Sequence, residues 1–323
     1  MRLTFPCLLF IFMLSLPERA SAWNATGHQL VARIAWNAMT PAVRQRVIAL
    51  LEAAPGDACL RELLPADARP LAARRREFFM DASTWADIVR PGENDTRPCT
   101  RFHRPEWHYI NYFWQGVSGA TGPGRPTDRS DLVPPASNVV AQLPLLRAFA
   151  ACTTPQCGTT TAERAIALAW ILHLVGDMHQ PLHTNARITS QPNEQKGDQG
   201  GNLFVLQTGP PALRLHGYWD SIVDRSVPRQ DGESQPAYVG RVAASITTKH
   251  PRTEALARLR PGDFDAWARE GLDTAKMSVY PATLKRGELP REEYRVQAFR
   301  FAEAAIALAG YRLGDLLTRM FGA

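Results

Sequence analysis

The sequence predicts an all-α fold: a mainly helical single domain with one small β-hairpin. Apolar residues recur at intervals of three and four along most of the chain, and only one pair of segments has a strand pattern. With 323 residues, 45% of them hydrophobic, the chain is long enough for a substantial core. No internal repeat divides it, so we expect one domain over residues 23–323.

The first 22 residues are expected to be a signal peptide. Arg2 precedes an apolar run over residues 3–16, and Ala20 and Ala22 supply the small residues of an A-x-A cleavage site. The apolar run is too short for a comfortable membrane span, and no later segment reaches the necessary length. We therefore expect cleavage before Trp23 and export of the protein, either to the periplasm or out of the cell.

Five segments have the helical pattern. The first, residues 40–53, starts with Thr40 as a predicted N-cap and Pro41 at the first helical position. The others cover residues 136–151, 163–179, 262–280 and 291–321. Strand patterns on either side of "TGPP", at 202–207 and 212–216, predict the hairpin. Turn-forming residues predict long loops over 91–104 and 116–135.

Four cysteines follow the predicted signal peptide, and we expect two disulfides. The short spacing pairs Cys152 with Cys157, which leaves Cys59 with Cys99. A thiolate metal site is the alternative, but the chain has no C-x-x-C pair.

Charge and composition separate few function classes. The net charge of +6 would attract polyanions, but it is also ordinary for a soluble protein. The preference for arginine over lysine suggests a bacterial source with a high G+C content.

The segment "HLVGDMHQPLH", residues 173–183, concentrates histidine and aspartate within apolar sequence. On a helix, His173 and Asp177 project from the same face, and His216 and Asp220 repeat that spacing. A carboxylate among apolar residues is costly without a cation. Two such pairs therefore favour metal ligands over chance.

Two further histidines lie in the same segment. Pro181 is expected to end the helix, so that His183 turns back toward the same cavity. His179 lies about 200° around the helix from Asp177 and is expected to have a structural role.

Candidate ligands also occur earlier in the chain. Asp87 lies in an apolar helical turn, His108 lies among aromatic residues, and His28 lies five positions after Trp23. Signal cleavage would free the α-amino group of Trp23, whose pKa near 8 allows a metal to displace its proton. Any one of these residues alone is readily explained as structural. The full set favours a multi-zinc site, because imidazole and carboxylate ligands without thiolate suit catalytic zinc.

These residues resemble the S1/P1 nuclease family, which is related to the bacterial zinc-dependent phospholipases C. The resemblance is carried by Trp23 with His28, "WAD" at 85–87, "WHYIN" at 107–111, "HLVGDMHQPLH", and "LHGYWD" at 215–220. It implies a phospholipase C/P1 nuclease-like helical fold with three zinc ions at the bottom of a cleft.

The resemblance also implies which residues hold each ion. The first ion takes Asp87, His108, His173 and Asp177. The second shares Asp177 as a bridge and takes His28 together with the amine and carbonyl of Trp23. The third takes His183, His216 and Asp220.

The implied catalytic residues are Asp87 and Asp177, with Asp87 accepting the proton of the attacking water. Tyr109 and Asn111 occupy positions that stack on and hydrogen-bond a nucleobase in the fungal enzymes. Tyr109 keeps an aromatic platform. Asn111 is an amide where those enzymes have a carboxylate, so the donor and acceptor pattern differs and the base preference stays open.

The implied activity is a zinc-dependent endonuclease that cleaves single-stranded DNA and RNA to 5′-phosphate products, with 3′-nucleotidase activity on nucleotides. We expect a monomer without a stable protein partner. The alternative enzyme is a zinc-dependent phospholipase C, but those relatives place the first histidine farther from the N-terminal tryptophan and use glutamate at the position of Asp220. An exported zinc-storage or structural protein is a non-enzymatic alternative, although structural zinc sites are usually closed by four protein ligands.

Overall fold

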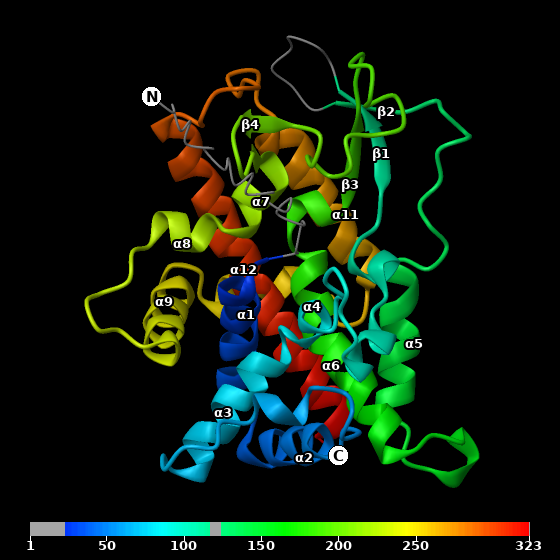
Figure 1. The fold of residues 1–323 in the computed structure, drawn as a ribbon, viewed down its shortest axis with the longest axis vertical. Coiled ribbons are helices and arrows are strands. Elements are labelled where there is room, and N and C mark those ends of the chain that lie inside the picture. The colour runs from blue at the N-terminus through cyan, green and yellow to red at the C-terminus, as the bar shows by residue number, and fades with distance from the viewer. Residues whose placement is uncertain (1–22, 117–123, 323) are drawn as a thin grey trace, which may run out of the picture.

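The computed structural model describes residues 23–116 and 124–322, and helices dominate it (Figure 1). The predicted signal peptide lies outside the described residues. The α-helices are α1 (Ala25–Ala38), α2 (Pro41–Glu52), α3 (Leu71–Ala82), α4 (Trp85–Ile88), α5 (Val139–Ala151), α6 (Thr161–Met178), α7 (Leu215–Asp220), α8 (Ile222–Ser226), α9 (Gln235–Lys249), α10 (Arg252–Ala255), α11 (Phe264–Thr274) and α12 (Glu292–Phe321). The mainly helical class is confirmed.

The five predicted helical segments correspond to α2, α5, α6, α11 and α12. The Thr40 hydroxyl caps α2 by accepting from the Val43 amide at 3.3 Å, and Pro41 is its first residue. The segment at 262–280 changes after Thr274 into a π-helix, Ala275–Val279. Helices α1, α3 and α9 were not predicted.

Helix α6 runs through the middle of the fold and carries the central motif (Figure 1). Thr160 and Glu163 form a capping box at its start, which satisfies two free amides of the first turn. Apart from the half-buried Ile166, all its side chains from Ala165 to Met178 are buried. Neighbouring helices thus surround α6, and its His173 and Asp177 lie deep in the protein.

Helix α1 packs lengthwise against the long C-terminal helix α12 (Figure 1). At Gly310 a Cβ atom would lie 2.5 Å from the Cβ of Ile34, so the two backbones approach more closely than any side chain would permit. This packing fixes the position of α1, and with it His28.

The predicted hairpin is confirmed as the antiparallel strands β4 (Val205–Gln207) and β5 (Leu213–Arg214). A second sheet was not predicted. It has the order β2-β1-β3, with strands β1 (Tyr112–Gln115), β2 (Arg125–Pro126) and β3 (Asn185–Ile188). Strand β2 lies inside the predicted loop 116–135, and the predicted loop 91–104 contains the short 3₁₀-helix Pro98–Phe102.

Strands β1 and β3 are parallel and begin shortly after the "WHY" and "QPLH" segments. Just before them, the Ile110 amide donates to the His183 carbonyl at 2.8 Å. The sheet therefore holds two of the predicted ligand segments side by side.

Both predicted disulfides are present, Cys59–Cys99 and Cys152–Cys157, with Cα atoms 5.8 Å and 6.3 Å apart. Within residues 23–116 and 124–322, no helix combines the length and the apolar character needed to span a membrane.

Candidate metal centre

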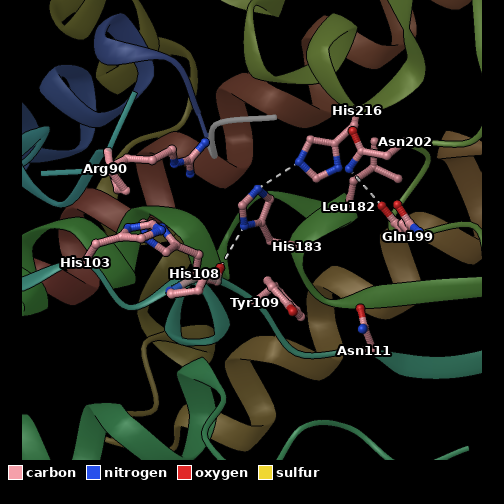
Figure 2. A pocket seen from close by; sticks show the side chains of 12 residues that line it. Arg90, His103, His108, Tyr109, Asn111, Leu182, His183, Gln199, Asn202 and His216 are labelled. Atoms are coloured by element: carbon pink, nitrogen blue, oxygen red, sulfur yellow. Dashed lines mark hydrogen bonds between the residues drawn. The ribbon is translucent and has the colours of Figure 1, made fainter. Parts of the chain in front are cut away.

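Five of the predicted site residues, His108, Tyr109, Asn111, His183 and His216, line one cavity of about 580 Å³. Figure 2 shows His183 and His216 with their rings turned toward each other, and Tyr109 and Asn111 on the same wall. The cavity is lined by Arg90, Pro91, His103, Pro105, His108, Tyr109, Asn111, Leu182, His183, Gln199, Asn202 and His216.

The carboxylate of Asp177 is the centre of the first group. It is fully buried, and its Oδ2 lies 2.9 Å from Nδ1 of His108 and 3.2 Å from Nε2 of His173. Its other oxygen, Oδ1, lies 3.3 Å from Nε2 of His28. The two oxygens thus face histidines on different sides, as a carboxylate shared by two cations requires.

Asp87 reaches the same group from the short helix α4. Its Oδ2 lies 3.9 Å from Nε2 of His173, and its Oδ1 accepts from Nη2 of Arg90 at 3.1 Å. His28, Asp87 and His173 present ligand atoms within 4.8 Å of one another, and so do His108, His173 and Asp177. His173 belongs to both sets, so the two sets form one continuous cluster.

The second pair on a helix, His216 and Asp220 of α7, forms a separate group with His183. Nε2 of His216 lies 3.0 Å from Nε2 of His183 and 3.7 Å from Oδ2 of Asp220. Gln180 donates to Oδ1 of Asp220 at 2.7 Å, which leaves Oδ2 directed at the histidines.

The hydrogen-bond partners of His183 and His216 show that this group suits a cation. Nδ1 of His183 lies 2.7 Å from the His108 carbonyl, and Nδ1 of His216 lies 2.7 Å from the Gly200 carbonyl. A carbonyl only accepts, so in both rings Nδ1 must donate, and in the neutral ring Nε2 is a lone pair. The lone pairs on the two Nε2 atoms, which lie 3.0 Å apart, repel each other unless both nitrogens bind the same cation.

The titration behaviour supports neutral rings in this group. Burial, together with the charge of His183, lowers the pKa of His216 to about 3. Burial also lowers the pKa of His183 and raises that of Asp220 well above its ordinary value. Without a cation, burial thus disfavours the charged form of all three groups.

The first group carries charge instead. Burial opposes a charged His173, but Asp177 and Asp87 outweigh it and raise its pKa to about 9. Burial likewise opposes a charged Asp177, yet His173 and the hydrogen bonds of the surrounding histidines hold its pKa well below the ordinary value. The paired carboxylates therefore require positive charge, which a proton supplies when no metal does.

Within residues 23–116 and 124–322, several buried polar atoms of these groups have no hydrogen-bond partner. They are Nδ1 and Nε2 of His28, Nε2 of His108, and Oδ1 of Asp177. Buried polar groups are rarely left unpaired. Because these atoms are histidine nitrogens and a carboxylate oxygen, the donor set fits zinc.

Trp23 is fully buried at the start of α1. The amide of the next residue, Asn24, donates to the carbonyl of Asp220 at 3.0 Å. The predicted new N-terminus therefore lies beside the last residue of α7.

His179, expected to point away from the site, does so. Its Nδ1 lies 2.7 Å from the Val175 carbonyl, and Nη1 of Arg312 lies 2.8 Å from its Nε2. Burial and the charge of Arg312 lower its pKa far below the ordinary value, so it is a neutral core histidine.

The groups that orient the candidate ligands were not predicted from the sequence. The Ser83 carbonyl lies 2.8 Å from Nδ1 of His173, and the Gly200 carbonyl fixes His216. Gly200 has φ +60°, and a Cβ there would lie 2.2 Å from the Leu182 carbonyl oxygen. The glycine-rich sequence "KGDQGGN" signals this tight turn, but no side-chain pattern identifies a carbonyl partner.

Buried histidines and carboxylates that converge on a cavity in a mainly helical protein define the framework of a metal-dependent hydrolase. The chain belongs to the S1/P1 nuclease family, since the family model named S1/P1 Nuclease matches residues 23–322. It is therefore a hydrolase acting on ester bonds, and the zinc-storage alternative is set aside. The predicted bacterial source stays a prediction.

Relatives among characterised proteins include endonucleases of Arabidopsis thaliana. Endonuclease 2 is 23% identical over 98% of this chain and 96% of its own length. Endonucleases 5 and 4 are 26% and 25% identical, and each match covers about half of both chains.

Proposed function

We propose that this protein is a zinc-dependent endonuclease that cleaves single-stranded DNA and RNA to 5′-phosphate products and also removes 3′-phosphates from nucleotides. The observation that carries the proposal is the presence of three groups of histidines and carboxylates with ligand atoms within 4.8 Å of one another, two of which reach the cavity through His108, His183 and His216. Family membership and the endonuclease names of the relatives support the substrate class.

We assign three zinc ions to these groups. The first takes Asp87, His108, His173 and Asp177. The second takes Asp177, His28, and the amine and carbonyl of Trp23. The third takes His183, His216 and Asp220. The close approach of Oδ1 of Asp177 to His28 supports the bridging role. The burial of Trp23 next to Asp220 supports a ligand role for the N-terminus.

Zinc bound at such a site neutralises phosphodiester charge and lowers the pKa of a coordinated water to about 7. Asp87, partly buried and held by Arg90, accepts the proton of the attacking water at a carboxylate oxygen. Asp177, fully buried and shared between histidines, fixes the relative positions of His28, His108 and His173.

Tyr109 and Asn111 are half-buried in the cavity wall near His183 (Figure 2) and would receive the nucleobase. Stacking on an aromatic ring contributes about 1–3 kcal/mol per base. Because the candidate ligands lie on the floor of a recess, a flexible single strand should enter more easily than a duplex.

The two disulfides, and the match to the family model that begins at Trp23, support export of the protein after cleavage of the signal peptide.

The test is digestion of a single-stranded oligonucleotide by the mature protein, before and after chelation and after zinc is restored. We expect chelator-sensitive release of 5′-phosphorylated products that zinc restores. Asp220→Asn should lower zinc content and activity. Asp224→Asn is the matched control, because this exposed carboxylate is four residues away, accepts from the Asn24 side chain at 2.6 Å and belongs to none of the three groups.

Absence of cleavage by the fully zinc-loaded protein would contradict the nuclease proposal. Faster hydrolysis of a short-chain phosphatidylcholine than of the oligonucleotide would instead favour the phospholipase C alternative.

A further inference from the structure

A buried carboxylate, Asp198, lies in the glycine-rich turn before β4 and belongs to none of the three candidate metal groups. It is fully buried. Its Oδ1 accepts from the Arg187 amide at 2.9 Å, and its Oδ2 accepts from the Tyr280 hydroxyl at 2.7 Å. A carboxylate is costly to bury unless hydrogen bonds satisfy it, so these two bonds account for the position of Asp198.

The backbone of Asp198 ties the turn to its neighbours. Its amide donates to the Arg187 carbonyl of β3 at 2.9 Å, and its carbonyl accepts from the Leu203 amide at 3.1 Å. Four residues around it have left-handed φ angles, namely Gly197, Gln199, Gly200 and Gly201. Three of the four are glycines, which adopt many conformations, so the shape of this turn depends on the contacts of Asp198.

Tyr280 lies directly after the π-helix, and its ring is held in place. The Arg187 guanidinium lies 4.1 Å from the ring centroid, and the Trp114 ring packs edge-on against it with centroids 5.8 Å apart. The hydroxyl also lies against the turn, because a Cβ at Gly201 would be 3.2 Å from it. The ring contacts therefore fix the hydroxyl, and the hydroxyl fixes Asp198.

The turn carries the carbonyl that orients His216. Two positions after Asp198, the Gly200 carbonyl lies 2.7 Å from Nδ1 of His216. That contact leaves Nε2 of His216 directed at His183 and Asp220. A hydrogen bond of this kind fixes the direction of a metal-binding imidazole and raises its basicity, and its loss typically costs about 10–100-fold in metal affinity or activity.

We propose that the hydrogen bond from Tyr280 to Asp198 positions His216 for the third cation by holding the turn that carries the Gly200 carbonyl. The contacts are continuous, from Tyr280 to Asp198, along the backbone to Gly200, and from Gly200 to His216. Tyr280 and Asp198 act through the turn, so both are positioning residues. This inference rests on the assignment of His216 to a metal in the proposed function.

Dialysis of the full mature protein against chelator-buffered zinc, followed by elemental analysis, measures how many ions it retains at each free zinc concentration. Tyr280→Phe keeps the ring and removes the hydroxyl, whereas Asp198→Ala removes the acceptor. Each should weaken the binding of one zinc ion by about tenfold and leave the other ions unchanged. His216→Ala should lose the same ion and thereby identifies it.

Tyr311→Phe is the matched control. Its hydroxyl donates to the His250 carbonyl at 2.7 Å, the same distance as from Tyr280 to Asp198, and it belongs to none of the metal groups. This variant should lose one tyrosine hydrogen bond and keep the zinc affinity of the wild type.

Asp198→Asn tests whether hydrogen bonding is what the turn requires. The amide oxygen still accepts from the Arg187 amide, and the amide nitrogen can donate to the Tyr280 oxygen. Asp198→Asn should therefore keep most of the zinc affinity that Asp198→Ala loses. A role in general stability alone would not confine the loss to one ion.

Zinc retention in Tyr280→Phe and Asp198→Ala equal to that of Tyr311→Phe would overturn the proposal. Tyr280→Phe removes a single oxygen atom, so the result does not depend on the folding of Asp198→Ala. If His216→Ala also retains all the zinc of the wild type, the assignment of the third ion fails, and the positioning role fails with it. Retention is measured without substrate, so absence of cleavage would contradict the proposed function separately.

Discussion

Replacing Gly176 by alanine should disable the metal centre through a single methyl group. Gly176 lies on α6 one residue before Asp177, and a Cβ there would lie 2.6 Å from Nδ1 and 3.0 Å from Cε1 of His28. An ordinary contact begins at 3.4 Å, so the imidazole must move by about 0.8 Å, the difference between 3.4 and 2.6. The ring is rigid and fully buried, so it cannot avoid the methyl group by swinging into solvent.

A displacement of this size at a catalytic group costs about 10²-fold in rate, or about 2.7 kcal/mol of transition-state stabilisation. The overpacking costs about 1–3 kcal/mol of folding free energy, and replacing a mid-helix glycine by alanine returns about 0.5–1 kcal/mol. We therefore expect a folded protein with strongly reduced kcat/KM and zinc content. Oligonucleotide cleavage, elemental zinc analysis and thermal denaturation measure the three quantities.

Two glycine variants separate site displacement from general destabilisation. Gly314→Ala would place its Cβ 2.9 Å from the Cβ of Ala38, at the far end of α1, so it should reduce stability and retain zinc. Among the described residues outside its own helix, a Cβ at Gly240 meets only Nη2 of Arg33 within 4 Å, at 3.8 Å, so Gly240→Ala should be neutral or stabilising. Wild-type zinc content and kcat/KM in Gly176→Ala would refute the assignment of His28 to the metal centre.

The other predictions concern Asp177, the N-terminus and Asp81. Asp177→Ala should abolish most activity and lower zinc content by two ions, and elemental analysis that finds the wild-type amount would contradict the bridging role. An extra residue before Trp23 should impair the enzyme because the free amine moves, whereas equal turnover of extended and mature forms would exclude the amine as a ligand. Burial raises the pKa of Asp81 to about 6, against the opposing hydrogen bond from Gln29. The folded state therefore keeps a proton that the unfolded state loses near pH 4, and this group's contribution to stability falls between about pH 4 and 6. Asp81→Asn should consequently raise the free energy of unfolding at pH 7.5 by about 1–2 kcal/mol after allowance for partial exposure, and by much less at pH 4.5. The same gain at both pH values in urea denaturation would show that the carboxyl charge is not responsible.

The sequence predicts the parts of the site that lie within one helix. His173 with Asp177 and His216 with Asp220 are four residues apart, and helical geometry alone places each pair on one face. The orientation of His216 toward His183 depends on the Gly200 carbonyl in the loop before β4; the glycine-rich sequence marks a turn there, but no side-chain pattern shows which histidine the carbonyl holds.

The missed elements have similar causes. Strands β1 and β3 are four residues long and pair in parallel across a large separation in sequence, so neither gives a recognisable periodicity. Helix α3 contains three consecutive arginines, which obscure its apolar stripe. Helix α9 does carry a stripe, formed by Tyr238, Val239, Val242, Ala243 and Ile246, and it was missed.

The backbone carbonyls that orient the histidines show why the site needs the whole fold. His173 is oriented by Ser83, His183 by His108, and His216 by Gly200. In each case the carbonyl belongs to a different segment from the histidine it fixes, so a ring keeps its direction only while those segments stay packed. Metal binding would in turn stabilise that packing, because the ligands become available together only in the folded state. The lone pairs of His183 and His216 repel each other in the folded state until a cation binds both. The proposed zinc would therefore raise the free energy of unfolding as well as serve the chemistry.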